Sequence, residues 1–200
     1  MLAFERHVLE LTFGTVALKR LALCGVGETR LSALGAVHCR IWEMEDRARS
    51  KAASYQQVAT LKGQIDADNR LRHDLIDEID RSVLPRDATV GAARYSETIG
   101  ELCDRLIVLR LKVEAAQGLA SDAALPDESR AFCRSRGDGL FRWWEFLRDC
   151  LSDQLESCLH GRAVLAPRNE FKIYCYPEFN PFRRGGEERA TLTRRDSNGP

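Results

Sequence analysis

Hydrophobic residues recur at helical spacing along most of the chain, and the longest such run lies between Val58 and Leu84. Its apolar positions fall on one face of a helix: Val58, Leu61, Ile65, Leu75 and Ile79. In the middle of this stretch the same face carries Asp68, Asn69 and Arg72 instead. Burying polar groups without partners costs free energy, so these side chains must meet others. The pattern therefore predicts a helix with a charged zone on its inner face.

The same periodicity predicts four more helices. Their ranges are Phe4 to about Leu23, Glu28 to about Arg49, Ser96 to Leu119, and Pro126 to His160. Ser96 is the expected N-cap of the fourth helix, and Gly137 and Gly139 predict a kink or a break in the last. Short connections between long helices favour antiparallel neighbours. The predicted fold is therefore all-α, an antiparallel up-and-down bundle of four to five helices.

The C-terminal part has a different character. Residues 171–182, FKIYCYPEFNPF, contain aromatic residues and two prolines, and we expect an extended strap across the bundle. The remaining residues, 183–200, are polar and contain glycine, which predicts a disordered tail. The predicted organisation is one helical-bundle domain over residues 1–182, followed by this tail.

Composition narrows the functional classes. The formal net charge of zero argues against a nucleic-acid-binding surface. The seven cysteines include no CxxC pair, so neither a zinc site nor a disulfide framework is indicated, and small buried thiols in a reducing cytosol fit better. No uncharged apolar run reaches about 18 residues, so we expect no membrane span and a cytoplasmic protein. The apolar N-terminus should pack into the bundle.

Three of the predicted helices place charged or amide groups where a core face is expected. They are His38, Glu45, Asp46 and Arg49 on the second helix, Asp66, Asn69, Arg72, His73 and Asp74 on the third, and Glu97, Asp104 and Arg105 on the fourth. Paired arginine and carboxylate groups inside a bundle can fix its register without any substrate. The same groups, converging from three helices, can also form a ligand site. For His38 and His73 taken singly, a hydrogen-bonded structural role is favoured.

Four segments carry a family resemblance. IWEMEDRAR resembles the pattern LWHxEDxAR, and LKGQIDADNRLRHDLIDEID resembles vKRxIDxLNQxRNDxIExID. SETIGELCDRLIVLRLK resembles sETxGxMIDRLsILxLK, and RNEFKIYCYPEFNPF resembles the closing pattern xFKMYNDPxLNP. In this order, over about residues 37–181, the segments resemble the bacterial family called domain of unknown function 4254. The resemblance implies a soluble, mostly helical bacterial protein near cell-surface glycan assembly, and it implies no settled activity.

The chain matches these patterns at many of the charged positions, and it departs from them at three. Matching residues include Glu45, Asp46, Arg49, Asn69, Arg72, Asp80, Gly100, Asp104, Arg105 and Lys172. Glu43 follows the tryptophan where the pattern has histidine, and His38 and His73 stand where it has asparagine. A family activity that required that histidine would be lost or altered in this chain.

Two kinds of function fit these observations. The first is an accessory protein that acts through a protein partner; Trp143 and Trp144 could supply its surface, although core positions are favoured for both. The second is a small-molecule binder or enzyme acting on an anionic glycosyl or phosphoryl substrate. In that case Glu45 or Asp104 would be the general acid or base and His73 a proton shuttle. The anion ligands would be Arg49, Arg72, Arg105 and Lys172, with His38, Asp46 and Asn69 completing the site.

No cofactor is expected, apart from Mg²⁺ in one alternative. Asp77 and Asp80 share a helix face, as do Glu101 and Asp104. If the two helices run antiparallel across the loop 85–95, four carboxylates face one another and a hard cation could bridge them. This arrangement resembles the acidic helix pairs of all-α nucleoside-triphosphate pyrophosphohydrolases, in which the metal positions the phosphates. Neutralisation of the same carboxylates by arginine is the competing interpretation.

Overall fold

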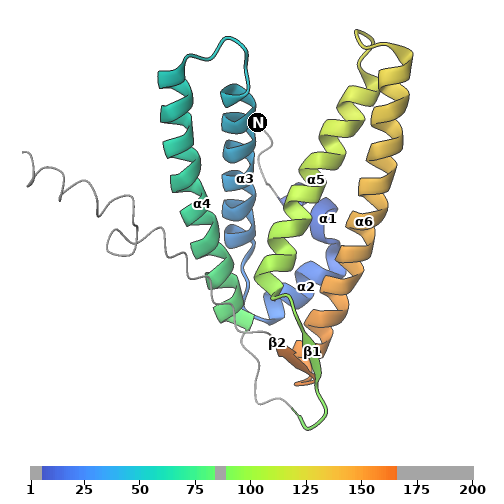
Figure 1. Ribbon diagram of the computed structural model, residues 1–200. Helices are drawn as coiled ribbons and strands as arrows, with labels where there is room; N and C mark the ends of the chain where they lie inside the picture. Colours follow the sequence, from blue (N-terminus) through green and yellow to red (C-terminus); the bar gives the residue numbers. More distant parts are fainter. Residues whose placement is uncertain (1–5, 84–88, 166–200) are drawn as a thin grey trace, which may run out of the picture. The chain divides into compact units, whose positions relative to one another are not determined.

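The computed structural model describes residues 6–83 and 89–165, and the elements of this part are shown in Figure 1. The helices are α1 (Arg6–Phe13), α2 (Thr15–Leu23), α3 (Glu28–Ala48), α4 (Tyr55–Val83), α5 (Ile99–Ser121) and α6 (Asp127–Leu159). Two short strands, β1 (Ala93–Tyr95) and β2 (Ala163–Leu165), complete the set. Helix α3 packs along α4, and α5 packs along α6. The predicted all-α antiparallel bundle is therefore confirmed.

The predicted first helix is divided in two by Gly14. This residue has φ 79°, in the left-handed region that favours glycine, and the chain turns there between α1 and α2. The described part of the chain consequently has six helices instead of four to five. Leu9, Phe13 and Leu21 are fully buried, which confirms that the N-terminus packs into the core. Within the described residues, no helix is both long and apolar enough to cross a bilayer.

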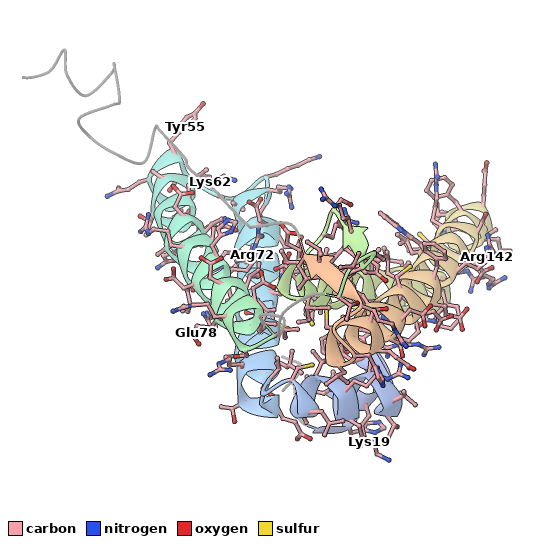
Figure 2. All side chains as sticks on the ribbon, turned by 90° about the horizontal axis from the view of Figure 1, so that it is seen from below. Lys19, Tyr55, Lys62, Arg72, Glu78 and Arg142 are labelled. Carbon is pink, nitrogen blue, oxygen red and sulfur yellow. The ribbon has the colours of Figure 1, made fainter. Side chains whose placement is uncertain are left out.

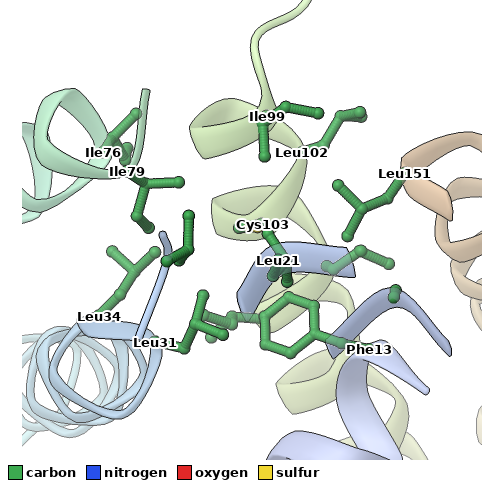
Figure 3. Packing of buried hydrophobic residues seen from close by; sticks show 14 of the residues in the cluster. Phe13, Leu21, Leu31, Leu34, Ile76, Ile79, Ile99, Leu102, Cys103 and Leu151 are labelled. Atoms are coloured by element: carbon green, nitrogen blue, oxygen red, sulfur yellow. The ribbon is translucent and has the colours of Figure 1, made fainter. Parts of the chain in front are cut away.

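The hydrophobic core surrounds α5. Ile99, Leu102 and Cys103 on α5 are buried together with side chains from the neighbouring helices, as Figure 3 shows: Phe13, Leu21, Leu31, Leu34, Ile76, Ile79 and Leu151. Helix α5 contacts α1, α3, α4 and α6, as expected of a helix that is apolar on more than one side. Charged side chains on α5 are therefore brought close to several helices at once.

Helix α5 begins later than its sequence pattern suggested. Thr98, and not Ser96, is the N-cap: its Oγ1 accepts from the Glu101 amide at 3.1 Å, and the Thr98 amide donates to Glu101 Oε2 at 2.9 Å. This reciprocal pair is a capping box. Shortly before the helix, β1 pairs in parallel with β2 in the register Ala93–Ala163. A three-residue strand is too short to give a periodic pattern, so neither β1 nor β2 was predicted from the sequence.

Helix α6 is continuous through its two glycines, so the break that they could have caused is absent. Gly137 is buried, and a Cβ there would lie 3.3 Å from the Cβ of Ala116 on α5, so this glycine lets the two helices approach closely. Gly139 has open space where a Cβ would be. The predicted strap over residues 171–182, the tail 183–200 and the domain boundary at residue 182 lie outside the described residues and stay predictions.

Candidate functional site

Three helices meet at the carboxylate of Asp104 on α5. His38 Nε2 on α3 lies 2.7 Å from Asp104 Oδ1, and Arg72 Nε on α4 lies 3.4 Å from the same oxygen. The exposed side-chain fractions are 5 % for His38, 18 % for Asp104 and 26 % for Arg72. The predicted convergence of charged groups from three helices is thus present at these residues, which we call the Asp104 cluster. Arg72 is labelled in Figure 2.

The Asp104 cluster is a set of internal partners, in which Arg72 Nε lies within ion-pair distance of Asp104 but forms no hydrogen bond. A carboxylate oxygen accepts hydrogen bonds, so His38 donates from Nε2 and that nitrogen has no lone pair for use as a base. The nearby Arg72 guanidinium supplies positive charge to the same oxygen. Asp104 therefore has one hydrogen-bonding partner on α3 and one cationic neighbour on α4, an arrangement that can hold α3, α4 and α5 together without a substrate.

A ladder of ion pairs joins α3 to α4. Arg40 forms a bidentate pair with Asp68, with Nε–Oδ2 2.9 Å and Nη2–Oδ1 2.8 Å. Arg30 Nε lies 3.3 Å from Glu78 Oε2. Arg30 and Arg40 are ten residues apart, and Glu78 and Asp68 are ten residues apart in the opposite direction. A single antiparallel register therefore accounts for both pairs.

Arg40 was missed by sequence reasoning, although it has the strongest geometry of the ladder. The pKa of its guanidinium is raised, first by the hydrogen bond to Asp68. Planar bidentate pairing with carboxylate is specific to arginine. The sequence did contain one indication of this pair. Asp68 interrupts an apolar face, so it needed a positively charged partner at the same level on the neighbouring antiparallel helix.

This pair leads to a testable prediction. Arg40→Asp should lower the free energy of unfolding by about 1 kcal/mol, and the charge swap Arg40→Asp with Asp68→Arg should recover at least half of the loss. Urea unfolding followed by circular dichroism measures both. If the swap is no more stable than the single variant, the pair does not determine the register.

The second catalytic candidate, Glu45, lies apart from the Asp104 cluster. Its carboxylate is held by Lys62 Nζ at 3.1 Å and by Arg49 Nη2 at 2.9 Å, and Asp46 lies 3.9 Å from Arg49 on the exposed surface. Glu45 follows His38 by seven residues on α3, which corresponds to roughly 10 Å along the axis. The structure therefore does not bring Glu45 and Asp104 together as an acid–base pair.

The remaining candidates are dispersed. Arg105 Nη1 lies 2.6 Å from Glu97 Oε1 near the start of α5, and both side chains are partly exposed. Asn69 and His73 are half-buried on α4. Lys172 lies outside the described residues. Three groups of contacts involve the described candidates: Glu45 with Arg49 and Lys62, Arg105 with Glu97, and the Asp104 cluster.

The four carboxylates of the magnesium alternative are directed to other partners. Asp80 Oδ1 accepts from the Gly100 amide at 2.7 Å, Glu101 belongs to the capping box, and Asp104 is paired with His38 and Arg72. Asp77 is exposed. Over residues 6–83 and 89–165, no group of three or more His, Cys, Asp or Glu side chains could hold a metal ion. Asp80 and Glu101 thus accept from backbone amides near the start of α5, and Asp104 lies against His38 and Arg72. Magnesium binding by these four carboxylates stays a prediction.

The cysteines behave as buried thiols. Cys39, Cys103 and Cys158 are buried, Cys24, Cys133 and Cys150 are half-buried, and all six are free. Burial raises the pKa of the Cys158 thiol from 9.0 to about 11, and it also raises the pKa of Cys103. A raised pKa suppresses the thiolate, so neither thiol is prepared for nucleophilic chemistry.

Because the pKa of Cys158 is raised, we expect the free energy of unfolding to decrease at alkaline pH. Between pH 9 and 11 the folded thiol keeps its proton while the unfolded thiol ionises, so the native state binds more protons and its stability falls as pH rises. The loss over this window should be about 2 kcal/mol. Urea unfolding at several pH values, compared with Cys158→Ala, measures it. An identical pH slope in the two proteins would contradict the assignment.

Two of the grooves on the described surface have linings that do not include the Asp104 cluster. One is beside the α3–α4 connection and includes Arg47, Ser54 and Gln57. The other, about 670 Å³, runs along α6 between Phe132 and Trp143. Trp144 is buried as expected, with Arg110 and Arg148 over its ring at 5.9 and 5.0 Å. Trp143 is 48 % exposed, so the core position favoured for it was wrong.

These features define a helical-bundle protein whose helices α3, α4 and α5 share buried ion pairs. Residues 28–166 match the family model described as protein of unknown function (DUF4254), and the chain belongs to this family. The match runs from the start of α3 to the residue after β2 and confirms the resemblance. A search of curated proteins found no match, and a search of solved structures found none either.

Proposed function

We propose that this protein is a non-catalytic helical binding module that acts through a protein partner. The observation that carries this proposal is the internal pairing of the catalytic candidates. Asp104 is hydrogen-bonded to His38 and lies beside Arg72, and Glu45 pairs with Lys62 and Arg49. Charges that compensate one another within a fold favour a structural role for the ion pairs.

Surface composition supports the same proposal. Helix α6 exposes Phe132, Trp143 and Phe146 by 61 %, 48 % and 64 %. Exposed clusters of aromatic side chains on a folded domain are typical of protein interfaces, where tryptophan and arginine contribute most of the binding energy. In the setting suggested by the family resemblance, the module would serve the bacterial cytoplasmic side of cell-surface glycan assembly.

The competing function is binding or turnover of an anionic glycosyl or phosphoryl compound at the Asp104 cluster. Its support is the partial exposure of Arg72 and Asp104 beside a histidine. Such a site would need Arg72 to exchange its contact with Asp104 for the ligand, and neutral variants of the cluster would abolish it.

Cross-linking in cells distinguishes these functions. The full chain, tagged and expressed in the organism that carries its gene, should give specific protein cross-links by mass spectrometry. The same cross-links should persist in the double variant Arg72→Gln with Asp104→Asn, provided that circular dichroism shows it folded. Absence of any specific protein cross-link for the parent, or loss of them in the folded neutral variant, would contradict the proposal.

A further inference from the structure

Helix α6 presents a second seam beside its core face, which we call the α6 seam: Phe132, Arg136, Gly139, Arg142, Trp143 and Phe146. Phe132, Gly139 and Phe146 are seven residues apart, and Arg136 and Trp143 are also seven apart. A seven-residue repeat keeps side chains aligned along one side of a helix and is the repeat by which two helices pack along each other. The core side chains Trp144, Leu147 and Leu151 occupy the adjacent face against the rest of the bundle.

The seam has the shape and composition of a helix-docking surface. Its three aromatic residues are 48–64 % exposed and line or adjoin the groove on α6. At its middle, Gly139 has no heavy atom within 4 Å of the position a Cβ would take. Glycine in a helix interior costs about 1 kcal/mol relative to alanine, and an open glycine on an aromatic seam lets another backbone approach closely.

The charges along the α6 seam indicate which kind of partner would bind there. Arg136 and Arg142 line the groove and no carboxylate does; among the described residues neither guanidinium forms an ion pair. Arg136 instead lies over the Phe132 ring at 5.3 Å, and Arg142 projects from α6 in Figure 2. A symmetric pairing of two α6 seams would place four guanidinium groups together, because an isologous interface repeats the same patch on both sides. A second copy is therefore disfavoured, and a partner with carboxylates is favoured.

We infer that the α6 seam docks an amphipathic helix of a different protein, with apolar side chains against Phe132, Trp143 and Phe146 and acidic side chains facing Arg136 and Arg142. This inference rests on the proposed function, and it adds the place and the chemistry of the contact. Helix-on-helix docking through regularly spaced anchors is an established mode of recognition. Arginine–carboxylate pairs at the solvent-exposed edge of such a contact speed association with the correct partner and disfavour partners of the wrong charge.

Site-specific photocross-linking in cells tests it on the full chain. The photoreactive amino acid p-benzoylphenylalanine replaces Phe146 in one strain, and Tyr55, which is 98 % exposed on α4, in a control strain. We expect a light-dependent adduct with another protein from position 146 alone. Peptide mapping should place the cross-link in an amphipathic helix flanked by Asp or Glu. Adduct formation should fall about tenfold in Arg136→Glu with Arg142→Glu.

The matched control is Arg70→Glu with Arg134→Glu, two exposed arginines off the seam that change the net charge equally. It should keep the adduct within about twofold of the parent. An adduct with a second copy of this chain, a ribonuclease-sensitive adduct, a basic partner segment, or an equal loss in both charge variants would overturn the inference. If protein cross-links occur only elsewhere on the chain, the inference fails and the proposed function stands; if there are none anywhere, both fail.

Discussion

Gly100→Ala should destabilise the fold by about 3 kcal/mol or more, the largest effect we expect from a single methyl group. A Cβ at this position would lie 2.6 Å from the backbone oxygen of Ile76 and 2.9 Å from Asp80 Oδ1. A backbone oxygen in a helix cannot move aside as a flexible side chain can. The first turn of α5 would therefore have to separate from α4.

The same substitution would disturb a hydrogen bond that joins the two helices. The Gly100 amide donates to Asp80 Oδ1 at 2.7 Å, so Asp80 satisfies one of the free amides at the positive end of α5. Urea unfolding measures the loss. Gly63→Ala is the control, because nothing lies within 4 Å of its Cβ position on α4, and it should stabilise the protein by about 0.5–1 kcal/mol. A Gly100→Ala protein as stable as its parent would contradict the close approach of α4 and α5.

After Gly100→Ala, the largest effect among our predictions is expected for Asp104→Ala. This substitution should lower the free energy of unfolding by about 2–3 kcal/mol. It leaves Arg72 without the carboxylate beside it and removes the acceptor of the buried His38 Nε2. The upper values measured for fully buried pairs do not apply, because Asp104 and Arg72 keep partial contact with water. Thermal and urea unfolding should agree on the loss.

His38→Gln is the informative companion to this variant. The glutamine amide nitrogen takes about the place of histidine Nε2, so it can still donate to Asp104. Its loss should stay within about 1 kcal/mol. If His38→Gln were as damaging as Asp104→Ala, the histidine would contribute more than the hydrogen bond seen in the structure.

Much of this fold could be predicted because helical periodicity is a strong local signal. The stripe containing Leu61, Ile65, Leu75 and Ile79 is buried, and α5 is central, as its two apolar seams required. The charged interruption of the α4 stripe correctly indicated that Arg72 meets other charged helices. Whether a side chain faces the core depends on its position within its own helix, and that position can be read from the spacing of residues in the sequence.

The pairing of the charges could not be predicted in the same way, because it depends on the register between helices. The Arg40–Asp68 pair requires one particular offset of α3 against α4, and the Asp80–Gly100 hydrogen bond requires α5 to begin at a particular height on α4. The magnesium alternative considered arginine as the other partner of the four carboxylates, but the sequence did not show that Asp80 and Glu101 accept from backbone amides near the start of α5. Gly14 and Trp143 show the same limit: a local pattern does not say where the chain turns or which aromatic residue stays exposed.

The claim that the Asp104 cluster is a set of internal partners is tested most directly by a double-mutant cycle on Arg72 and Asp104. The variants Arg72→Met, Asp104→Leu and the combination of both are unfolded in urea, and the coupling free energy is taken from the three losses. Our account predicts that the double variant loses at least about 1 kcal/mol less than the sum of the single variants, because each single change leaves one charge uncompensated. Losses that add within about 0.3 kcal/mol would show that the two groups do not depend on each other, and would contradict the account.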